Sequence, residues 1–128
     1  MPKVIIITGV SSGIGMATAI RLAAEGHKVY GFSRRKINHP KIISIQIDIN
    51  DRQSVKQAVN NIIEQEGRVD VLINNAGIGI GGAAELTTEE EINLQMTTNF
   101  LSTVDLCKNV LPHMRHQGNG KIINISSI

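Results

Sequence analysis

The sequence predicts an α/β protein in which a doubly wound parallel sheet is covered by helices. Three observations support this fold class. Ile occurs 21 times and Val nine times in the 128 residues, and β-branched side chains favour strands. They gather in short unbroken aliphatic runs, which are typical of strands buried on both faces. Segments with helical periodicity separate most of these runs, and such alternation is typical of a parallel sheet with crossover helices.

The first part of the chain contains three of the strands. Aliphatic runs predict them over residues 4–7, 27–32 and 42–47. A helix is expected over residues 13–25 with Gly26 as its C-terminal stop. The second and third strands are joined either by a loop or by a weakly patterned helix. Asn50 or Asp51 caps the next helix, which Gly67 ends.

The second part of the chain adds two strands and a long helix. The strands are expected over residues 69–73 and 121–125. Thr87 with Glu90, or Thr88 with Glu91, can form a capping box that opens the helix. The helix runs to about Arg115 in one or two pieces. Apolar residues spaced by four and three predict one continuous face on it, formed by Phe100, Val104, Cys107, Leu111 and Met114. These elements predict a Rossmann-like sheet with strand order 3-2-1-4-5.

The composition indicates one domain over residues 1–128 and excludes several protein classes. Hydrophobic residues make up 41%, which is too many for a disordered chain. Thirteen Lys and Arg against 11 Asp and Glu give a formal charge of +2, and no basic run exceeds residues 34–36, so nothing indicates a nucleic-acid partner. No apolar stretch approaches the roughly 18 residues of a membrane span. The single cysteine, Cys107, forms no internal disulfide and fits a cytoplasmic protein.

A glycine-rich turn lies between the first strand and the first helix. Its glycines are spaced as Gly9-x-x-x-Gly13-x-Gly15. Glycine allows the backbone to turn sharply and approach a ligand closely, and a helix N-terminus presents free N–H groups to a phosphate. The spacing lacks the Gly-Lys-Ser/Thr of a P-loop, which argues against an NTPase. The position of the turn favours a dinucleotide-phosphate site, and the alternative is a flexible surface turn.

Four motifs along the chain resemble those of the short-chain dehydrogenase/reductase family. The Thr-Gly-x-x-x-Gly-x-Gly of its compact branch is matched by residues 8–15, and its Asn-Asn-Ala-Gly by residues 74–77. Its helical Asn is matched by Asn99, and its Ser-Ser by Ser126 and Ser127. The matches occur in the family's order along the whole chain. The resemblance implies an oxidoreductase that transfers a hydride between a nicotinamide dinucleotide and a small carbonyl or alcohol substrate.

The end of the second strand indicates which dinucleotide is bound. A Rossmann site for NAD usually places an acidic residue there, but this sequence reads Ser33-Arg34-Arg35. A guanidinium group binds a 2′-phosphate through paired, charge-assisted hydrogen bonds. The sequence therefore predicts NADP(H) rather than NAD(H), with Arg34 as the first choice and Arg35 as the second. The alternative is that both arginines are ordinary surface charges.

The resemblance implies the remaining cofactor contacts. Asp48 and the backbone of Ile49 would contact the adenine, although Asp48 could equally be a turn or capping residue. The turn at residues 75–77 would run beside the adenosine ribose, and Asn74 is expected to support the sheet instead. The full expected set is Gly9, Ser11, Ser12, Gly13, Ile14, Gly15, Ser33, Arg34, Arg35, Asp48, Ile49, Asn75, Ala76 and Gly77.

Reduction of a ketone needs a proton donor at the developing alkoxide. In the family a Ser, a Tyr and a Lys carry the chemistry and the helical Asn assists. Ser127 matches the Ser, with Ser126 as the neighbouring alternative, and Asn99 matches the Asn. No Tyr-x-x-x-Lys is present, because the single tyrosine, Tyr30, lies in the second strand and Arg34 stands four residues later. We therefore expect that the C-terminal part of the fold is missing and that this chain alone is not catalytically competent.

Two interpretations follow. The first is an NADP(H)-dependent reductase represented by its cofactor-binding portion, which forms a homo-oligomer at full length. The second is a non-catalytic NADP(H)-binding or sensing module, or an inactive fragment. A Tyr-x-x-x-Lys beyond Ile128 would support the first. No metal site is expected, because neither Cys nor carboxylate accompanies His113 and His116.

Overall fold

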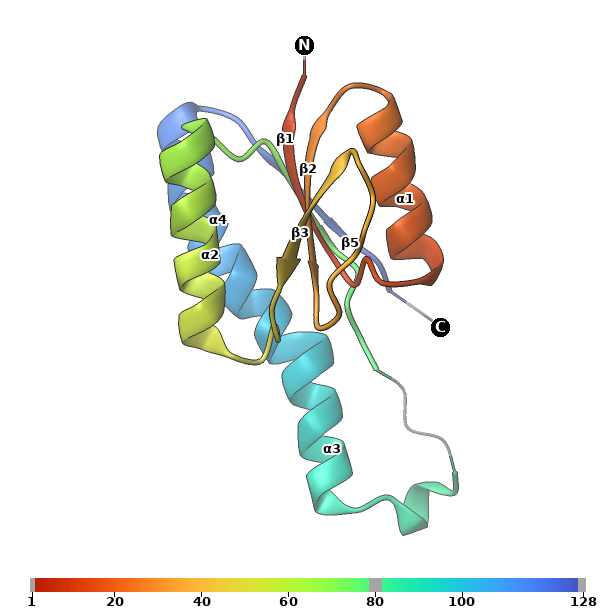
Figure 1. Ribbon diagram of the computed structural model, residues 1–128. Coiled ribbons are helices and arrows are strands. Elements are labelled where there is room, and N and C mark those ends of the chain that lie inside the picture. Colours follow the sequence, from red (N-terminus) through yellow and green to blue (C-terminus); the bar gives the residue numbers. More distant parts are fainter. Residues whose placement is uncertain (1, 79–81, 127–128) are drawn as a thin grey trace.

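A computed structural model describes residues 2–78 and 82–126 and contains one parallel five-stranded sheet (Figure 1). The strands are β1 (Val4–Thr8), β2 (Lys28–Ser33), β3 (Ile42–Gln46), β4 (Val71–Asn74) and β5 (Lys121–Asn124). Their order across the sheet is β3-β2-β1-β4-β5, with every neighbouring pair parallel. The Rossmann-like strand order predicted from the sequence is confirmed.

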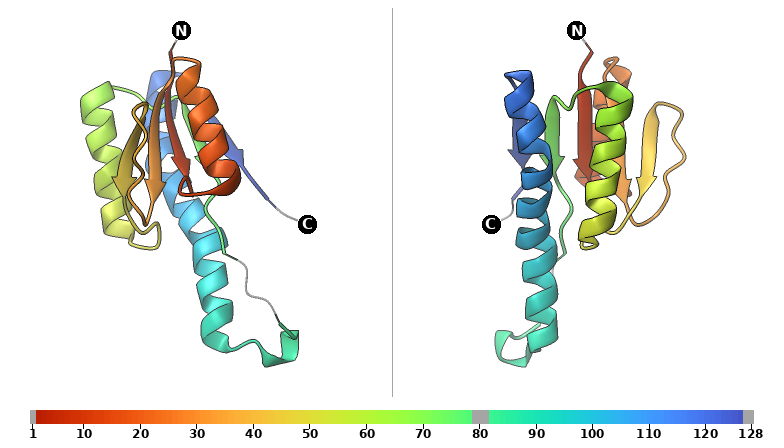
Figure 2. Two further views of the ribbon diagram at one scale, coloured as in Figure 1. Left: turned by 45° about the vertical axis from the view of Figure 1, so that its right-hand side comes forward. Right: turned by 90° about the vertical axis from the view of Figure 1, so that its left-hand side faces the viewer.

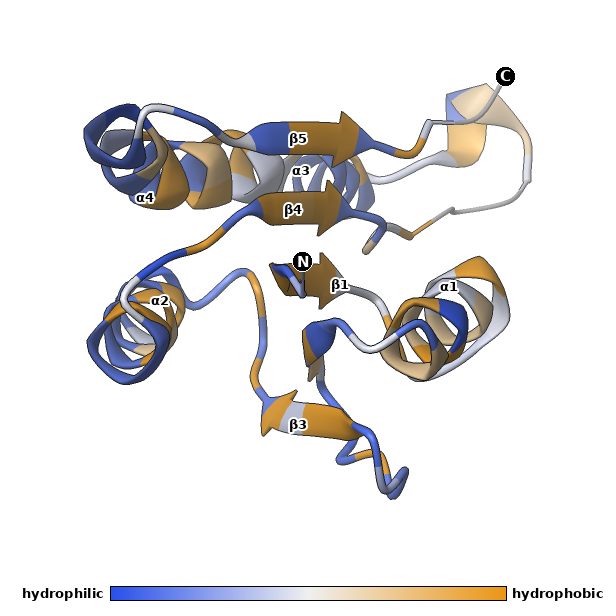
Figure 3. Ribbon diagram, turned by 90° about the horizontal axis from the view of Figure 1, so that it is seen from above, coloured by the Kyte–Doolittle hydropathy of each residue, from blue (hydrophilic) through white to orange (hydrophobic). Residues whose placement is uncertain are grey.

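Helices cover both faces of the sheet, as the view along its edge shows (Figure 3). The elements are α1 (Gly13–Ala24), α2 (Arg52–Glu66), α3 (Glu89–Met96) and α4 (Ser102–Gln117), with a short 3₁₀ turn η1 (Ala84–Leu86) and a π-helical turn η2 (Thr97–Leu101). One face is covered by α1, and the other by α2 and α4. The run α3–η2–α4 is one continuous helix that projects beyond the carboxyl edge of the sheet (Figure 2). Within the described residues, no helix has the length and apolar character needed to span a bilayer.

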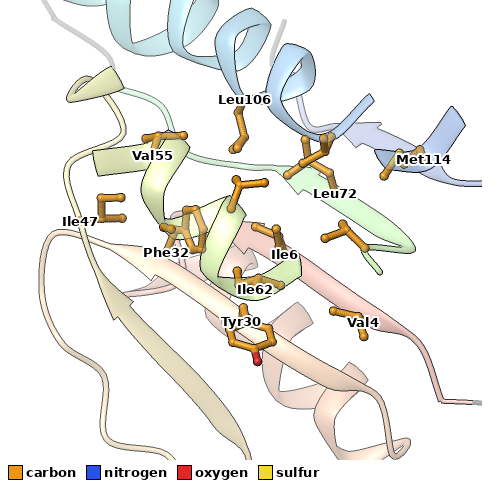
Figure 4. Packing of buried hydrophobic residues seen from close by; sticks show 14 residues of the cluster. Val4, Ile6, Tyr30, Phe32, Ile47, Val55, Ile62, Leu72, Leu106 and Met114 are labelled. Carbon is orange, nitrogen blue, oxygen red and sulfur yellow. The ribbon is translucent and has the colours of Figure 1, made fainter. Parts of the chain in front are cut away.

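The three central strands, β1, β2 and β4, are buried because alternate residues enter two separate cores. Ile6 packs with Leu72 and Leu106 on the α2 and α4 side (Figure 4), whereas Ile7 packs with Val10 and Ala19 on the α1 side. All five residues of β1 are buried. The unbroken aliphatic run therefore reports a central strand that is covered on both faces.

The ends of the helices follow the sequence signals. Asp51, and not Asn50, caps α2 by accepting from the backbone N–H of Ser54. Hydrogen bonds from the hydroxyl and then the backbone N–H of Ser54 lower the pKa of the Asp51 carboxyl. Thr88 and Glu91 form the capping box of α3. A loop joins β2 to β3, and β4 begins at Val71, two residues later than expected.

The expected apolar face of the long helix is wrong for three of its five residues. Phe100, Val104 and Leu111 are 55%, 40% and 37% exposed, whereas Met114 is buried and Cys107 packs against the core. The other residues that the helix buries against the sheet include Leu106 and Val110. This helix has two apolar stripes, and hydropathy alone does not distinguish the stripe that meets the sheet from the one that faces outward.

Candidate functional site

A cavity of about 750 Å³ lies at the carboxyl edge of the sheet and is lined by residues of the loops that follow β1, β2, β3 and β4. Most of the cofactor contacts expected from the sequence line it. They are Gly9, Ser11, Ser12, Ser33, Arg34, Arg35, Asp48, Ile49, Asn75, Ala76 and Gly77. Gly13, Ile14 and Gly15 are not in its wall and form the first turn of α1 instead. Ligands of open parallel sheets bind at this edge.

The glycine-rich turn brings the start of α1 against the loop after β4. A Cβ on Gly15 would lie 2.1 Å from the carbonyl oxygen of Gly9 and 2.4 Å from Nδ2 of Asn75, so only glycine fits there. Ser12 precedes α1 without a side-chain capping bond, and the first turn of α1 holds no acidic residue. The positive end of the helix dipole is therefore left uncompensated by side chains, which suits an anionic ligand.

Thr8 joins the two loops that form the floor of the cavity. Its buried hydroxyl oxygen accepts hydrogen bonds from the backbone N–H groups of Asn75 and Ala76, both at 2.9 Å. Nδ2 of the Asn75 side chain donates a hydrogen bond of 3.1 Å to the carbonyl oxygen of Gly9. Thr8 was not among the site residues expected from the sequence, although its place directly before Gly9 in the matched motif was a usable signal. Asn74 donates to Oδ1 of Asn124 on β5 at 2.9 Å and so supports the sheet, as expected.

Hydrogen bonds to the backbone carbonyl groups of Arg34 and Arg35 fix these two residues at the cavity. The Ser33 hydroxyl donates to the carbonyl oxygen of Arg35 at 2.5 Å, and Gln46 donates to that of Arg34 at 3.2 Å. The Arg35 guanidinium lies 3.5 Å from the carbonyl oxygen of Ser11 in the glycine-rich turn. Both side chains are exposed, and across residues 2–78 and 82–126 neither forms an ion pair. Two uncompensated positive charges therefore border the cavity.

Asp48 shapes the loop between β3 and α2. Its Oδ1 accepts from the backbone N–H of Asn50 at 2.9 Å, and its carbonyl oxygen accepts from the N–H of Asp51 at 2.9 Å. This is the turn role that the sequence left open. The carboxylate is nevertheless exposed in the cavity wall, beside Ile49.

Asn99 lies in the π-helical turn and binds the backbone of the loop after β4. Its Nδ2 donates to the carbonyl oxygen of Ile78, and its Oδ1 accepts from the N–H of Ile78, both at 2.7 Å. A Cβ on Gly77 would lie 3.0 Å from the same Oδ1. Ser126 is exposed just beyond β5. Ser127 lies outside the described residues, so its assignment stays a prediction.

Tyr30 lies away from the cavity, at the amino edge of the sheet. Its hydroxyl donates to Glu66 at 2.5 Å, and the Glu66 carboxylate also lies 2.8 Å from Nζ of Lys28. Burial, together with the bond to Glu66 and the charge of that carboxylate, raises the pKa of Tyr30. The bonds from Lys28 and Tyr30 lower the pKa of Glu66. This tyrosine is a structural donor.

One wall of the cavity was missed by sequence reasoning. Leu94 in α3 and Thr98 in η2 line it together with Asn50. These residues carry no motif, and they reach the site only because the long helix passes the loop after β3. No linear signal could have found them.

Comparisons with known proteins agree with this geometry. The sequence model of a family described as short chain dehydrogenase matches residues 3–128. The chain is 56% identical to 3-ketodihydrosphingosine reductase of Bacteroides thetaiotaomicron, over 99% of this chain and 48% of the relative. It is 32% identical to 3-oxoacyl-(acyl-carrier-protein) reductase FabG of Thermotoga maritima, over 98% of this chain and 56% of the relative.

Solved structures show the same likeness. A short-chain dehydrogenase from Streptomyces avermitilis superposes with a TM-score of 0.93 at 35% identity, over 99% of this chain and 50% of that one. ElxO with NADP bound superposes with a TM-score of 0.91 at 33% identity, over 99% and 56%. The chain spans about half the length of the relatives it matches. From its motifs, its sheet and these matches, the chain belongs to the short-chain dehydrogenase/reductase family.

Proposed function

We propose that these residues form the cofactor-binding portion of an NADP(H)-dependent oxidoreductase, which transfers a hydride between the nicotinamide ring and a carbonyl or alcohol substrate. The observation that carries the proposal is the position of Arg34 and Arg35 at the edge of the cavity, where neither guanidinium forms an ion pair with any residue that the structure describes. An acidic residue at this place would repel a 2′-phosphate, whereas a guanidinium binds it. ElxO, a structural relative, was solved with NADP bound.

The cavity residues fit the parts of such a dinucleotide. The uncapped start of α1, with Ser11, Ser12, Gly13, Ile14 and Gly15, suits the phosphates. Asp48 and Ile49 are assigned to the adenine, and residues 75–77 to the adenosine ribose. The bound cofactor supplies the hydride, and this chain's residues bind and orient it. NAD(H) is the less favoured ligand because both arginines would then lack a partner.

For the chemistry we assign Asn99 and Ser127 as catalytic residues. The support for Asn99 is its two-point bond to Ile78 in the cavity wall. The support for Ser127 is the family motif alone, and its role would be to hold the substrate oxygen. Tyr30 is bound to Glu66 at the opposite edge, so we propose that a residue outside these 128 donates the proton.

The first ketone to test is 3-ketodihydrosphingosine, because a relative named 3-ketodihydrosphingosine reductase is 56% identical to this chain. We also propose that the full-length protein is cytoplasmic and forms a homo-oligomer. The homo-oligomer is supported by the outward apolar stripe of the long helix, in which Phe100, Val104 and Leu111 are exposed.

The cofactor assignment is tested by measuring the dissociation constants of NADPH and NADH for the intact protein by calorimetry. Arg34→Ala should weaken NADPH binding by about ten- to a hundredfold, the size of one charged hydrogen bond of roughly 1.5–3 kcal/mol. NADH binding should stay unchanged. Arg52→Ala is the matched control, because Arg52 pairs with Asp105 outside the cavity. An unaltered preference in Arg34→Ala, or a wild type that prefers NADH, contradicts the assignment.

A further inference from the structure

The π-helical turn η2 interrupts the long helix beside the cavity. The backbone N–H of Ser102 donates to the carbonyl oxygen of Thr97, five residues earlier, where a regular helix would make a bond four residues apart. Such widened turns are rare and occur frequently at functional sites. This one carries Asn99 in its middle. The position of Asn99 therefore depends on whatever keeps the turn in its widened form.

Asn50, in the loop between β3 and α2, bonds to this turn from outside the helix. Its Nδ2 donates to Oγ1 of Thr98 at 2.9 Å, and its Oδ1 lies 2.5 Å from the hydroxyl of Ser102. The same hydroxyl lies 2.8 Å from the carbonyl oxygen of Thr97, which the π-type bond also uses. Thr98 and Ser102 are both buried. One side-chain amide thus contacts the residues on both sides of Asn99.

The turn is connected in the other direction to the loop after β4. Asn99 bonds to both backbone groups of Ile78, which lines the cavity. A shift of the turn would break these two bonds of 2.7 Å and release the chain after Gly77. The contacts therefore run from Asn50 through the turn to Asn99 and then to Ile78.

A second bridge joins the first residue of α2 to the same long helix and allows a comparison. Arg52 Nε lies 3.2 Å from Oδ1 of Asp105, beyond the π-helical turn. The Arg52 side chain is largely exposed, and surface ion pairs stabilise little. This bridge touches neither the turn nor Asn99. Its loss should leave the turn unchanged.

We infer that Asn50 is a positioning residue, which holds the π-helical turn so that Asn99 fixes the Ile78 side of the cavity. The bonds themselves are independent of any ligand. Their consequence for turnover rests on the proposed function. Asn50 acts through Asn99 and so is not itself assigned to the chemistry.

Hydrogen exchange of the cofactor-free intact protein tests the inference without an activity assay. The amide of Ile78 donates to Asn99, so its exchange reports whether that bond forms. Asn50→Ala and the isosteric Thr98→Val should each speed exchange at Ile78 by about fivefold or more relative to the amide of Ile6, while the double variant adds little. Arg52→Ala should leave the ratio unchanged. Equal acceleration at Ile78 and Ile6, or no change in both single variants, overturns the inference.

Kinetics of the intact enzyme give a second measurement. Asn50→Ala and Asn99→Ala should each lower kcat by about tenfold. Because Asn50 acts through Asn99, the kcat of the double variant should lie within about threefold of that of the less active single variant. Multiplicative losses overturn the inference even if exchange at Ile78 changes. A wild type that reduces no ketone, with exchange changed as expected, contradicts the proposed function alone.

Discussion

The two edges of the sheet use their polar side chains in opposite ways. At the amino edge, side chains bond to one another or to the edge itself. Tyr30 and Lys28 share Glu66, and Arg68 pairs with Asp70, which also accepts from the N–H of Val4 at 2.8 Å. The two carboxylates and the Tyr30 hydroxyl are thus paired within the fold. They serve the stability of the fold.

At the carboxyl edge, side chains bond to backbone and leave charges exposed. Thr8 and Asn75 fix two loops, while the guanidinium groups of Arg34 and Arg35 have no carboxylate partner among the described residues. Hydrogen bonds therefore fix the loops of this edge, while the charges of the two guanidinium groups stay available to a ligand. Changes at the amino edge should alter unfolding, and changes at the carboxyl edge should alter cofactor affinity. The following predictions test that division.

The largest effect on stability is expected at Asp70. Burial alone would raise the pKa of its carboxyl, but the bonds from Arg68 and the N–H of Val4, with the charges of Arg68 and Lys3, lower it overall. Asp70→Ala leaves the buried N–H of Val4 without an acceptor and should lower the free energy of unfolding by about 3 kcal/mol. Urea unfolding of the intact protein measures this change.

The matched control is Glu25→Ala, which removes an exposed ion pair with Arg21 and should cost at most about 0.5 kcal/mol. The dissociation constant of NADPH should be unchanged in both variants. A tenfold loss of affinity in Asp70→Ala, with the protein still folded, would show that the two edges are not separate.

The next effect is expected at Gly15 on the other edge. A Cβ there would overlap the Gly9 carbonyl, so the glycine-rich turn must move away from the loop after β4. Gly15→Ala should weaken NADPH binding at least about tenfold and cost about 2 kcal/mol of stability, as overpacking does. Gly67→Ala at the C-terminal end of α2 is the control. Gly67 has a φ of +77° in open space, so its replacement should cost about 1 kcal/mol and leave affinity intact. Equal affinities in the two variants would refute the assigned role of the turn.

The sequence was sufficient for the features that depend on local patterns. The run at residues 4–7 predicted a buried central strand, and Asp51 and Gly67 marked the ends of α2. The glycine spacing led to the cavity because the start of a helix after a parallel strand always lies at the carboxyl edge. These signals are short in range, and one chain suffices to recognise them.

Features that depend on distant contacts could not be predicted. The π-helical turn has no hydropathy signature, so the Asn50–Thr98 bond, which joins residues 48 positions apart, stayed hidden. The outward stripe of Phe100 and Val104 looked like a core face because hydropathy does not say which stripe meets the sheet. Likewise, nothing in the sequence around Tyr30 predicted that its hydroxyl donates a hydrogen bond to Glu66.

The smallest effect is expected from the acid titration of Glu66. Hydrogen bonds from Lys28 and Tyr30 hold the pKa of Glu66 below its ordinary value, so its contribution to stability is present above the pKa of the unfolded chain and is lost as the pH falls through the folded pKa. Between pH 6 and pH 3, wild type should therefore lose more stability than Glu66→Gln, by about 1 kcal/mol, the size of one hydrogen bond. Comparing the two proteins by urea unfolding at each pH cancels the parallel titration of Asp70. Tyr30→Phe keeps the Lys28 bond and should fall between them. Parallel pH profiles for all three proteins would mean that this cluster does not contribute to the stabilising role of the amino edge.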